Sequence, residues 1–120
     1  MTFVITLDTM PPPLSACYKN AAHRGRVKTQ RYKSWQNRHL MINPQLRGAV
    51  KFTTAVRVHI GIIRPDKRKR DLDNLLKPIC DLLTAGSVLE DDSLIHELSI
   101  RWHTRCGDDR PEVEICVSVC

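Results

Sequence analysis

The sequence lacks long apolar runs, paired cysteines and a secretory leader, and each absence narrows the class of protein. No window approaches about 18 uninterrupted apolar residues, so a membrane-spanning helix is not predicted. Residues 1–13 have no charged segment ahead of a short apolar stretch and no small-residue cleavage site, which argues against a signal peptide. The five cysteines are odd in number and contain no CxxC pair, which is typical of reduced thiols. We therefore expect a cytoplasmic protein without a disulfide framework.

Acidic residues are scarce in the first part of the chain. Residues 1–70 hold 15 Lys and Arg but only Asp8 and Asp66, a balance of +13, whereas residues 71–120 carry −7. A surface this basic favours a polyanionic partner, because neutralising phosphates releases condensed counterions. Nucleic acid is the first candidate and an anionic membrane surface the second.

Chain length and apolar patterning predict one domain over residues 1–120. With 120 residues and 42% hydrophobic content, the chain is large enough for a single core without metal or disulfide support. Alternation predicts strands and a 3-4 spacing predicts helices. The predicted order is strand 2–7, loop 14–28, helix 29–42, strand 53–63, helix 71–83 ended by Gly86, strand 94–104, turn 106–111 and strand 112–119. This β-α-β-α-β-β order predicts an α+β fold with a mixed sheet covered by helices.

Bases and acids meet at one point of the chain. The segment Arg64–Arg70 holds five bases and runs directly into Asp71 and Asp73, at a predicted strand-to-helix corner. A site that holds both a phosphodiester and Mg²⁺ needs both signs, because bases grip the backbone and carboxylates ligate the metal. The alternative is structural: Asp71 as a helix N-cap and Asp73 as an acid favoured in the first turn.

A second acidic cluster, Glu90-Asp91-Asp92, follows the helix. A turn after the helix can return the chain toward Asp71 and Asp73, and Asp92 then supplies a third carboxylate for one or two Mg²⁺ ions. The alternative is a solvated loop.

Lys77 shares a predicted helix face with Asp73 and Asp81, being four residues from each. It either belongs to a ladder of salt bridges or contacts the scissile phosphate beside the metal carboxylates. Pro78 removes a backbone N–H from this helix, so an irregular first turn is expected around Asp71 and Asp73.

Further side chains are candidates for nucleic-acid contact. The run 67–70 is predicted to bind phosphate, with a nuclear-localisation-like run or a solvated loop as the alternatives. The bases near residue 30 extend this footprint or form a soluble basic face. Tyr18, Tyr32 and Trp35 are candidates for stacking on unpaired bases, and for Trp35 a place in the core is favoured. The candidate DNA-binding residues are Lys67, Arg68, Lys69, Arg70, Arg24, Arg26 and Lys28, with Arg31 and Lys33 beside them.

The run from Arg70 to Asp81, followed by Leu89 to Ser93, closely resembles the RusA family of Holliday junction resolvases, which are small phage and bacterial endonucleases. The resemblance is strongest over residues 64–97 and extends more loosely to the whole chain. The family often has a polar, Asn-containing run after the prolines, where this chain has Leu14–Tyr18.

The resemblance implies a Mg²⁺-dependent homodimeric endonuclease that resolves four-way DNA junctions by paired, symmetric nicks. Asp71, Asp73 and Asp92 match the metal-binding acids of the family, Lys77 matches its catalytic lysine, and Asp91 matches a neighbouring accessory acid. A dimer also follows from the chemistry, since two opposed cuts need two sites and one chain holds one candidate site. The alternatives are a non-catalytic DNA-binding or architectural protein and a metal-dependent nuclease acting on forks, flaps or RNA.

Overall fold

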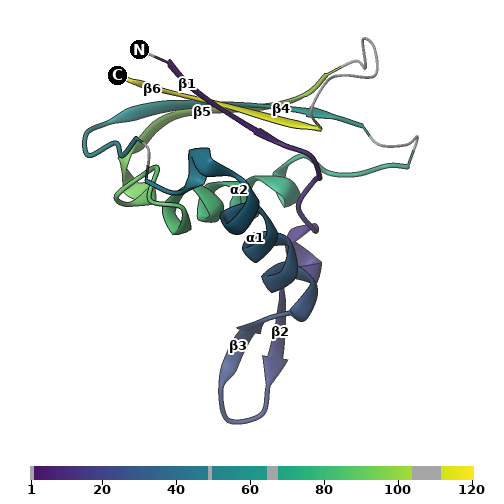
Figure 1. Cartoon of the computed structure of the whole chain (residues 1–120). Coiled ribbons are helices and arrows are strands. Elements are labelled where there is room, and N and C mark those ends of the chain that lie inside the picture. Colours follow the sequence, from purple (N-terminus) through teal and green to yellow (C-terminus); the bar gives the residue numbers. More distant parts are fainter. Residues whose placement is uncertain (1, 49, 65–67, 104–111) are drawn as a thin grey trace.

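A four-stranded mixed sheet with two helices packed on one face forms the main body of the molecule (Figure 1). The computed structural model describes residues 2–48, 50–64, 68–103 and 112–120. This arrangement confirms the predicted α+β class and the mixed sheet. The main elements are β1 (Thr2–Leu7), β2 (Tyr18–Ala21), β3 (Gly25–Lys28), α1 (Gln30–Ile42), β4 (Val56–Ile63), α2 (Asp73–Ala85), β5 (Ile95–His103) and β6 (Val113–Val119).

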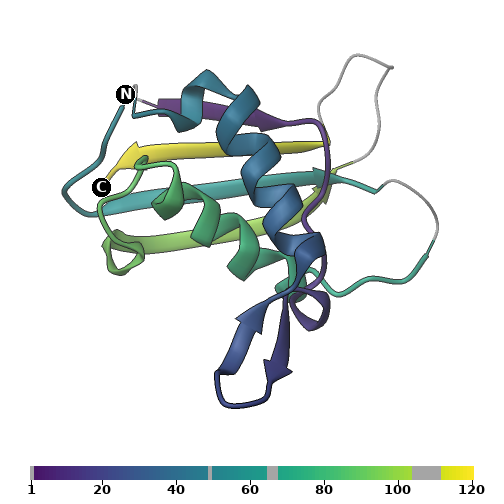
Figure 2. The same ribbon diagram turned by 60° about the horizontal axis from the view of Figure 1, so that its bottom comes forward.

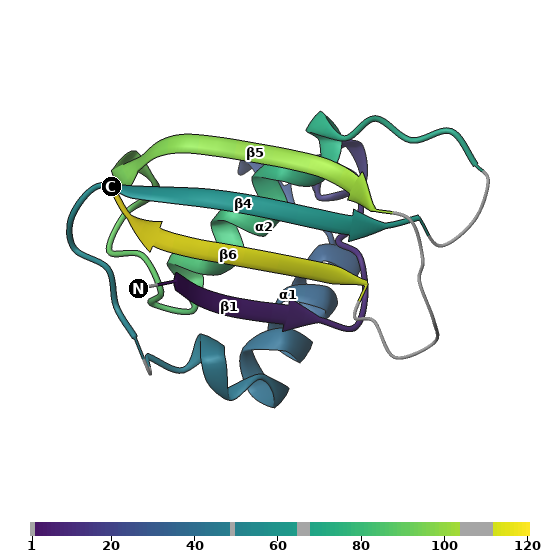
Figure 3. The ribbon, with the colours of Figure 1, turned by 90° about the horizontal axis from the view of Figure 1, so that it is seen from above.

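The strand order in the sheet is β1-β6-β4-β5. The β1–β6 and β4–β6 pairs are antiparallel, whereas β4 and β5 are parallel. A parallel pair needs a crossover, and α2 provides it on the face of the sheet that also carries α1 (Figure 2). The chain therefore leaves β4 at one end of the sheet and enters β5 at the other. Figure 3 looks onto the opposite face, with both helices behind the strands.

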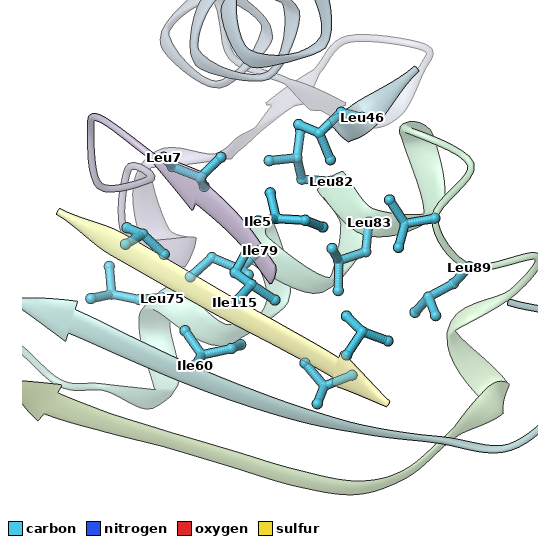
Figure 4. Close-up of a cluster of buried hydrophobic side chains, with 14 of the residues drawn as sticks. Ile5, Leu7, Leu46, Ile60, Leu75, Ile79, Leu82, Leu83, Leu89 and Ile115 are labelled. Carbon is cyan, nitrogen blue, oxygen red and sulfur yellow. The ribbon is translucent and has the colours of Figure 1, made fainter. Parts of the chain in front are cut away.

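The core lies between the sheet and the two helices (Figure 4). Ile5 and Ile115 from the sheet and Ile79 and Leu82 from α2 are all 0% exposed. Burial of one such side chain stabilises the fold by about 1.5–3 kcal/mol. The alternating pattern that predicted β4 is visible in its burial, because Val56, Val58, Ile60 and Ile62 are buried on the helix side.

The predicted loop at residues 14–28 is wrong. This segment forms a short 3-10 helix (Leu14–Ala16) and the antiparallel hairpin β2–β3, which projects away from the sheet (Figure 1). The backbone N–H of Thr29 donates to the carbonyl of Cys17 at 2.8 Å and closes the base of the hairpin. Both strands are rich in polar residues, so they lack the apolar alternation that identifies a strand.

The helix predicted at residues 29–42 is confirmed as α1, with Thr29 as its N-cap. The Thr29 hydroxyl oxygen accepts a hydrogen bond from the backbone N–H of Tyr32 at 3.3 Å. Tyr32 and Trp35 are buried, and the Trp35 indole Nε1 donates to the carbonyl of Thr9 at 3.3 Å. The prediction that Trp35 belongs to the core is confirmed.

The first turn of α2 is of the 3-10 type, so it is irregular as expected, but the bonds concerned do not involve Pro78. The backbone N–H groups of Asn74 and Leu75 donate to the carbonyls of Asp71 and Leu72, which are i to i−3 bonds of the 3-10 type. Leu72 occupies the N-cap position, so the alternative of Asp71 as the N-cap is not what the structure has. Asp73 does lie in the first turn, where the helix dipole favours a carboxylate.

The end of α2 is also as predicted, because the backbone N–H of Gly86 caps it by donating to the carbonyl of Leu82 at 2.8 Å. Two more 3-10 helices are present. Pro44–Leu46 follows α1, and Asp92–Leu94 directly precedes β5. The turn predicted at residues 106–111 lies outside the described residues. Within the part of the chain described, no helix is long and apolar enough to cross a membrane.

Candidate active site

A basic cleft of about 440 Å³ lies beside the N-terminus of α2. Arg31 from the first turn of α1 lines it together with Asp71 and Asn74. The proline-rich segment after β1 contributes Pro11 and Pro13 to the lining. The remaining lining residues are Met10, Arg68, Lys69, Arg70 and Leu75. Four bases and one carboxylate thus face a single cavity.

The cleft brings together much of the predicted phosphate-binding run. Arg68, Lys69 and Arg70 all line it, whereas Lys67 lies outside the described residues. Arg31, which the charge pattern placed only in a diffuse basic region, is a cleft residue. Its side chain comes from a different element, so only the packing of α1 beside α2 could reveal it.

Three further candidate DNA-binding bases lie on β3 or in the turn before it, and they are not among the residues that line the cleft. These are Arg24, Arg26 and Lys28. Arg26 stacks over the ring of Tyr18 at 5.0 Å, and Lys28 lies over the ring of Tyr32 at 5.5 Å. All three bases are exposed. They form a second basic surface on the hairpin.

Within one chain, Asp92 does not lie beside Asp71 and Asp73. Asp92 opens the 3-10 helix Asp92–Leu94, directly before β5 begins at Ile95. Because β4 and β5 are parallel, this point lies at the end of the sheet where β4 starts, whereas Asp71 follows the end of β4. The expectation that the turn after α2 carries Asp92 back to the first two acids is wrong for a single chain.

The three carboxylates suit Mg²⁺ by their chemistry, because hard oxygen donors are its preferred ligands. Asp71, Asp73 and Asp92 are all exposed. Within the described ranges, no three His, Cys, Asp or Glu side chains of one chain are gathered into a group that can hold a metal ion. The carboxylate oxygens therefore fit Mg²⁺ as ligands, whereas the positions of the three carboxylates within one chain do not.

Asp91 is held by its own loop. Its carboxylate accepts hydrogen bonds from the hydroxyl and the backbone N–H of Ser93, the latter at 3.3 Å. These bonds, the hydroxyl bond first, lower the pKa of Asp91. Asp91 therefore acts as the N-cap of the 3-10 helix that carries Asp92.

Lys77 belongs to a polar network centred on Asp81. The Lys77 ammonium lies 3.5 Å from Oδ1 of Asp81, while Oδ2 accepts from the hydroxyls of Tyr18 at 3.4 Å and Tyr32 at 3.3 Å. The side chain of Asp81 is 24% exposed and that of Lys77 is 55% exposed. Of the predicted ladder of salt bridges, the pair Lys77–Asp81 is present, and the Lys77 side chain remains exposed.

Tyr18 and Tyr32 are candidates for base stacking by their sequence, and the structure places both of their hydroxyls on Asp81 instead. Tyr32 is fully buried, and burial first, then the charge of Asp81, raises its pKa. Its hydroxyl therefore stays protonated and donates to the carboxylate. The spacing of Lys77 and Asp81 is readable in the sequence, but the approach of Tyr18 and Tyr32 depends on the hairpin and α1 packing beside α2.

The buried thiol of Cys80, in the middle of α2, is affected by the charges of nearby side chains. The pKa of its thiol is raised to about 11, first by burial and then by the charges of Asp81 and Asp92, while the charge of Lys77 opposes this effect. Lys77 and Asp92 thus both act on the same thiol. The four cysteines in the described residues, Cys17, Cys80, Cys116 and Cys120, are free thiols.

A basic cleft with a carboxylate in its wall and an exposed lysine on the adjoining helix is typical of proteins that act on a phosphodiester backbone. The family model described as endodeoxyribonuclease RusA matches residues 11–118 of this chain. The crossover junction endodeoxyribonuclease RusA of Aquifex aeolicus (strain VF5) is 32% identical over 94 residues, which cover 77% of this chain and 73% of that protein.

The chain therefore belongs to the RusA family of endodeoxyribonucleases, and the resemblance found in the sequence is confirmed. It is an enzyme of the class that hydrolyses phosphodiester bonds within DNA.

Proposed function

We propose that this protein resolves four-way DNA junctions in the cytoplasm by Mg²⁺-dependent, paired and symmetric nicks. The observation that carries the proposal is the cleft of a member of a family of endodeoxyribonucleases, which is lined by four bases together with Asp71, namely Arg31, Arg68, Lys69 and Arg70. The matching relative from Aquifex aeolicus is named as a crossover junction enzyme, which supports the junction as substrate.

The chain's own residues take distinct roles in this proposal. The cleft bases bind the phosphates that flank the cut and fix the register of the strand. Asp71, Asp73 and Asp92 would hold Mg²⁺ once the active species brings them together, and Asp91 is an accessory acid that positions Asp92. Mg²⁺ supplies charge neutralisation at the scissile phosphate and activation of water.

Lys77 stabilises charge that develops on the scissile phosphate, because an ammonium can donate up to three hydrogen bonds to phosphate oxygens. Its exposed position on α2 leaves it accessible to DNA. Arg24, Arg26 and Lys28 extend the footprint along a DNA arm.

The active species in this proposal is a homodimer. Resolving a junction requires one cut in each of two opposed DNA strands. Two-fold symmetry supplies two equivalent sites from one kind of chain. A four-way junction can itself adopt two-fold symmetry, so a symmetric protein matches its substrate.

Cleavage assays with one labelled strand test the proposal. The wild-type protein is offered a synthetic four-way junction, a fork, a linear duplex and an RNA duplex in Mg²⁺, alone and in competition. We expect the junction to be cut in preference to the other three. Preferential cutting of the fork or the RNA would show that the junction is not the preferred substrate. Junction binding without cutting would indicate an architectural protein.

The Asp73→Asn variant tests the mechanism with the same substrates. It removes an anionic ligand while keeping the size of the side chain, so we expect binding to persist and cleavage to be lost. Cleavage at the wild-type rate would contradict the assigned role of Asp73.

A further inference from the structure

Few aromatic side chains are placed to stack on a nucleobase. The chain holds two Trp, two Tyr and two Phe residues. The Tyr18 hydroxyl is bound to Asp81, and Phe3 lies in the first half of β1, toward the end of the sheet where β4 starts. The buried aromatic residues are Tyr32, Trp35 and Phe52. The remaining one, Trp102, is partly exposed and lies near the end of the sheet where β4 ends.

Trp102 lies at the end of the sheet that carries the N-terminus of α2. It is near the end of β5, an outermost strand (Figure 3). It pairs in register with Ile62, which is 0% exposed on the face that the helices cover. Residues directly opposite in neighbouring strands point to the same face, so the indole lies on the face that carries α2. Asp73 begins α2 and Asp71 follows the end of β4, so the indole is at the same end of the molecule as these two carboxylates.

The guanidinium of Arg64 lies over the Trp102 indole, with its central carbon 4.6 Å from the ring centroid. Arg64 is exposed and directly follows Ile63, the last residue of β4. It is also the first base of the run Arg64–Arg70, whose last three bases line the cleft. An aromatic face attracts a guanidinium, so the ring limits the directions that this flexible side chain takes. Trp102 therefore orients a planar, charged group at the start of the phosphate-binding run.

A guanidinium offers DNA more than its charge. Its flat face stacks on a nucleobase, and its N–H groups donate to phosphate oxygens. Within a linear duplex, each base is covered on both faces by its neighbours. At the branch point of a four-way junction the continuous stack is interrupted, so a base there leaves the stack at lower cost. A junction therefore offers Arg64 a stacking partner that a linear duplex does not.

We propose that Arg64 and Trp102 form a stacking platform for a nucleobase at the branch point of the junction. The inference rests on the proposed function, because it takes a four-way junction as the substrate. The base stacks on the exposed side of the Arg64 guanidinium, and Trp102 is a positioning residue that holds the guanidinium from the other side. The platform adds to the affinity for a junction and not to that for a linear duplex, so it contributes to the selection of substrate structure.

The Arg64→Lys variant separates stacking from a phosphate contact. It keeps the positive charge and removes the planar group. We expect its Kd for the junction to rise by about 10-fold, since the stacking of one base contributes on that order. Its Kd for a linear duplex and its slope of log affinity against log salt should match those of the wild type, because the charge is unchanged. Fluorescence anisotropy in excess chelator measures both without cleavage. A junction Kd equal to that of the wild type would overturn the platform.

Arg57→Lys is the matched control. Arg57 lies on β4, but it alternates with the buried Val56 and Val58 and so lies on the opposite face of the sheet. Its side chain is 48% exposed, and its Nε lies 3.7 Å from a carboxylate oxygen of Glu97. We expect wild-type affinity for both DNAs. An equal loss of junction affinity in Arg57→Lys and Arg64→Lys would show that the loss does not depend on the Trp102 indole, and would overturn the platform.

Abasic nucleotides identify the base that stacks. Each nucleotide next to the branch point is replaced in turn by an abasic one, and the Kd is measured with the wild type and with Arg64→Lys. One abasic position should weaken wild-type binding by about 10-fold and leave Arg64→Lys binding unchanged, because that variant has already lost the stacking contact. Equal effects on the two proteins at every position would overturn the stacking of a base on Arg64.

Trp102→Phe and Trp102→Leu test the positioning role of the indole. Both keep an apolar side chain against the core, and only Phe keeps an aromatic face. We expect Trp102→Phe to bind the junction as the wild type does, and Trp102→Leu to lose about 10-fold, with no further loss when it is combined with Arg64→Lys. Thermal unfolding checks that each variant is folded. Equal junction affinity of the two folded variants would contradict the positioning role.

Failure of the platform is distinguishable from failure of the proposed function. A wild-type protein that cuts the junction in Mg²⁺, beside an Arg64→Lys variant that binds it with unchanged affinity, would overturn the platform alone. A wild-type protein that neither prefers nor cuts the junction would contradict the proposed function, and the platform with it.

Discussion

Arg31 at the start of α1 and Asp71 just before α2 line the same cleft, although they are distant in the sequence. The two helices pack side by side on the sheet, and this packing brings separate basic segments to one cavity. A guanidinium in this position can grip a phosphate with two parallel hydrogen bonds.

Arg31→Ala is expected to weaken junction binding through loss of one phosphate contact. Each such contact contributes about 0.9 to the slope of log affinity against log salt, so the slope should fall by roughly that amount. Fluorescence anisotropy at several salt concentrations measures it. Lys33→Ala is the control, because Lys33 is an exposed base on the same helix that is not among the cleft residues. An equal effect of both changes would contradict a specific role for Arg31.

Asp81 is expected to position Lys77, with Tyr18 and Tyr32 holding the other carboxylate oxygen. Asp81→Asn keeps an acceptor for the tyrosines but removes the charge that holds the ammonium. We expect kcat to fall by about 10-fold, which corresponds to about 1.4 kcal/mol, with KM nearly unchanged.

A double-mutant cycle separates this positioning role from a purely structural one. In a Lys77→Met background, Asp81→Asn should have no further effect on kcat, because Asp81 acts through Lys77. An Asp81→Asn effect of the same size in both backgrounds would contradict the assignment. Thermal unfolding of each variant checks that the fold is retained.

His39 predicts a pH dependence of stability that is independent of the active site. Its ring is 1% exposed, and Nε2 lies 2.9 Å from the Thr9 hydroxyl. Burial lowers the pKa of His39 below its ordinary value, while the nearby Asp8 opposes this effect and Arg38 adds to it. The folded chain therefore binds fewer protons than the unfolded chain below about pH 6.5.

The free energy of unfolding should consequently decrease as pH falls from 7 toward 5. Urea denaturation at a series of pH values measures this slope, and His39→Gln should show a smaller decrease than the wild type. Identical slopes for the two proteins would show that His39 does not cause the pH dependence.

The sheet and both helices could be predicted because their residues carry strong periodic signals. In β4, apolar residues alternate with polar ones, and α2 repeats buried residues at helical spacing. The hairpin β2–β3 carries no such signal, since its strands read Tyr18–Ala21 and Gly25–Lys28 and bury little apolar surface. Its formation depends on pairing and on the bond between Thr29 and Cys17, which are invisible to local periodicity.

The site residues could likewise be predicted where they are adjacent in the sequence, and not where packing between elements brings them together. The adjacency of Arg70 and Asp71 is covalent, so their common place at the cleft could be read directly. The place of Asp92 depends on the direction of β5, because a crossover to a parallel strand starts that strand at the opposite end of the sheet. Arg31 and the two tyrosines reach the site only through packing between elements.

The most direct test of the proposed function is to map the cuts that the wild-type protein makes in a synthetic four-way junction. Each of the four strands is labelled in turn, and the reaction is run in Mg²⁺ and again with excess chelator. The account predicts two nicks at symmetric positions in opposed strands that vanish with the chelator. Nicks that persist in chelator, or a cut confined to one strand of the junction, would contradict it.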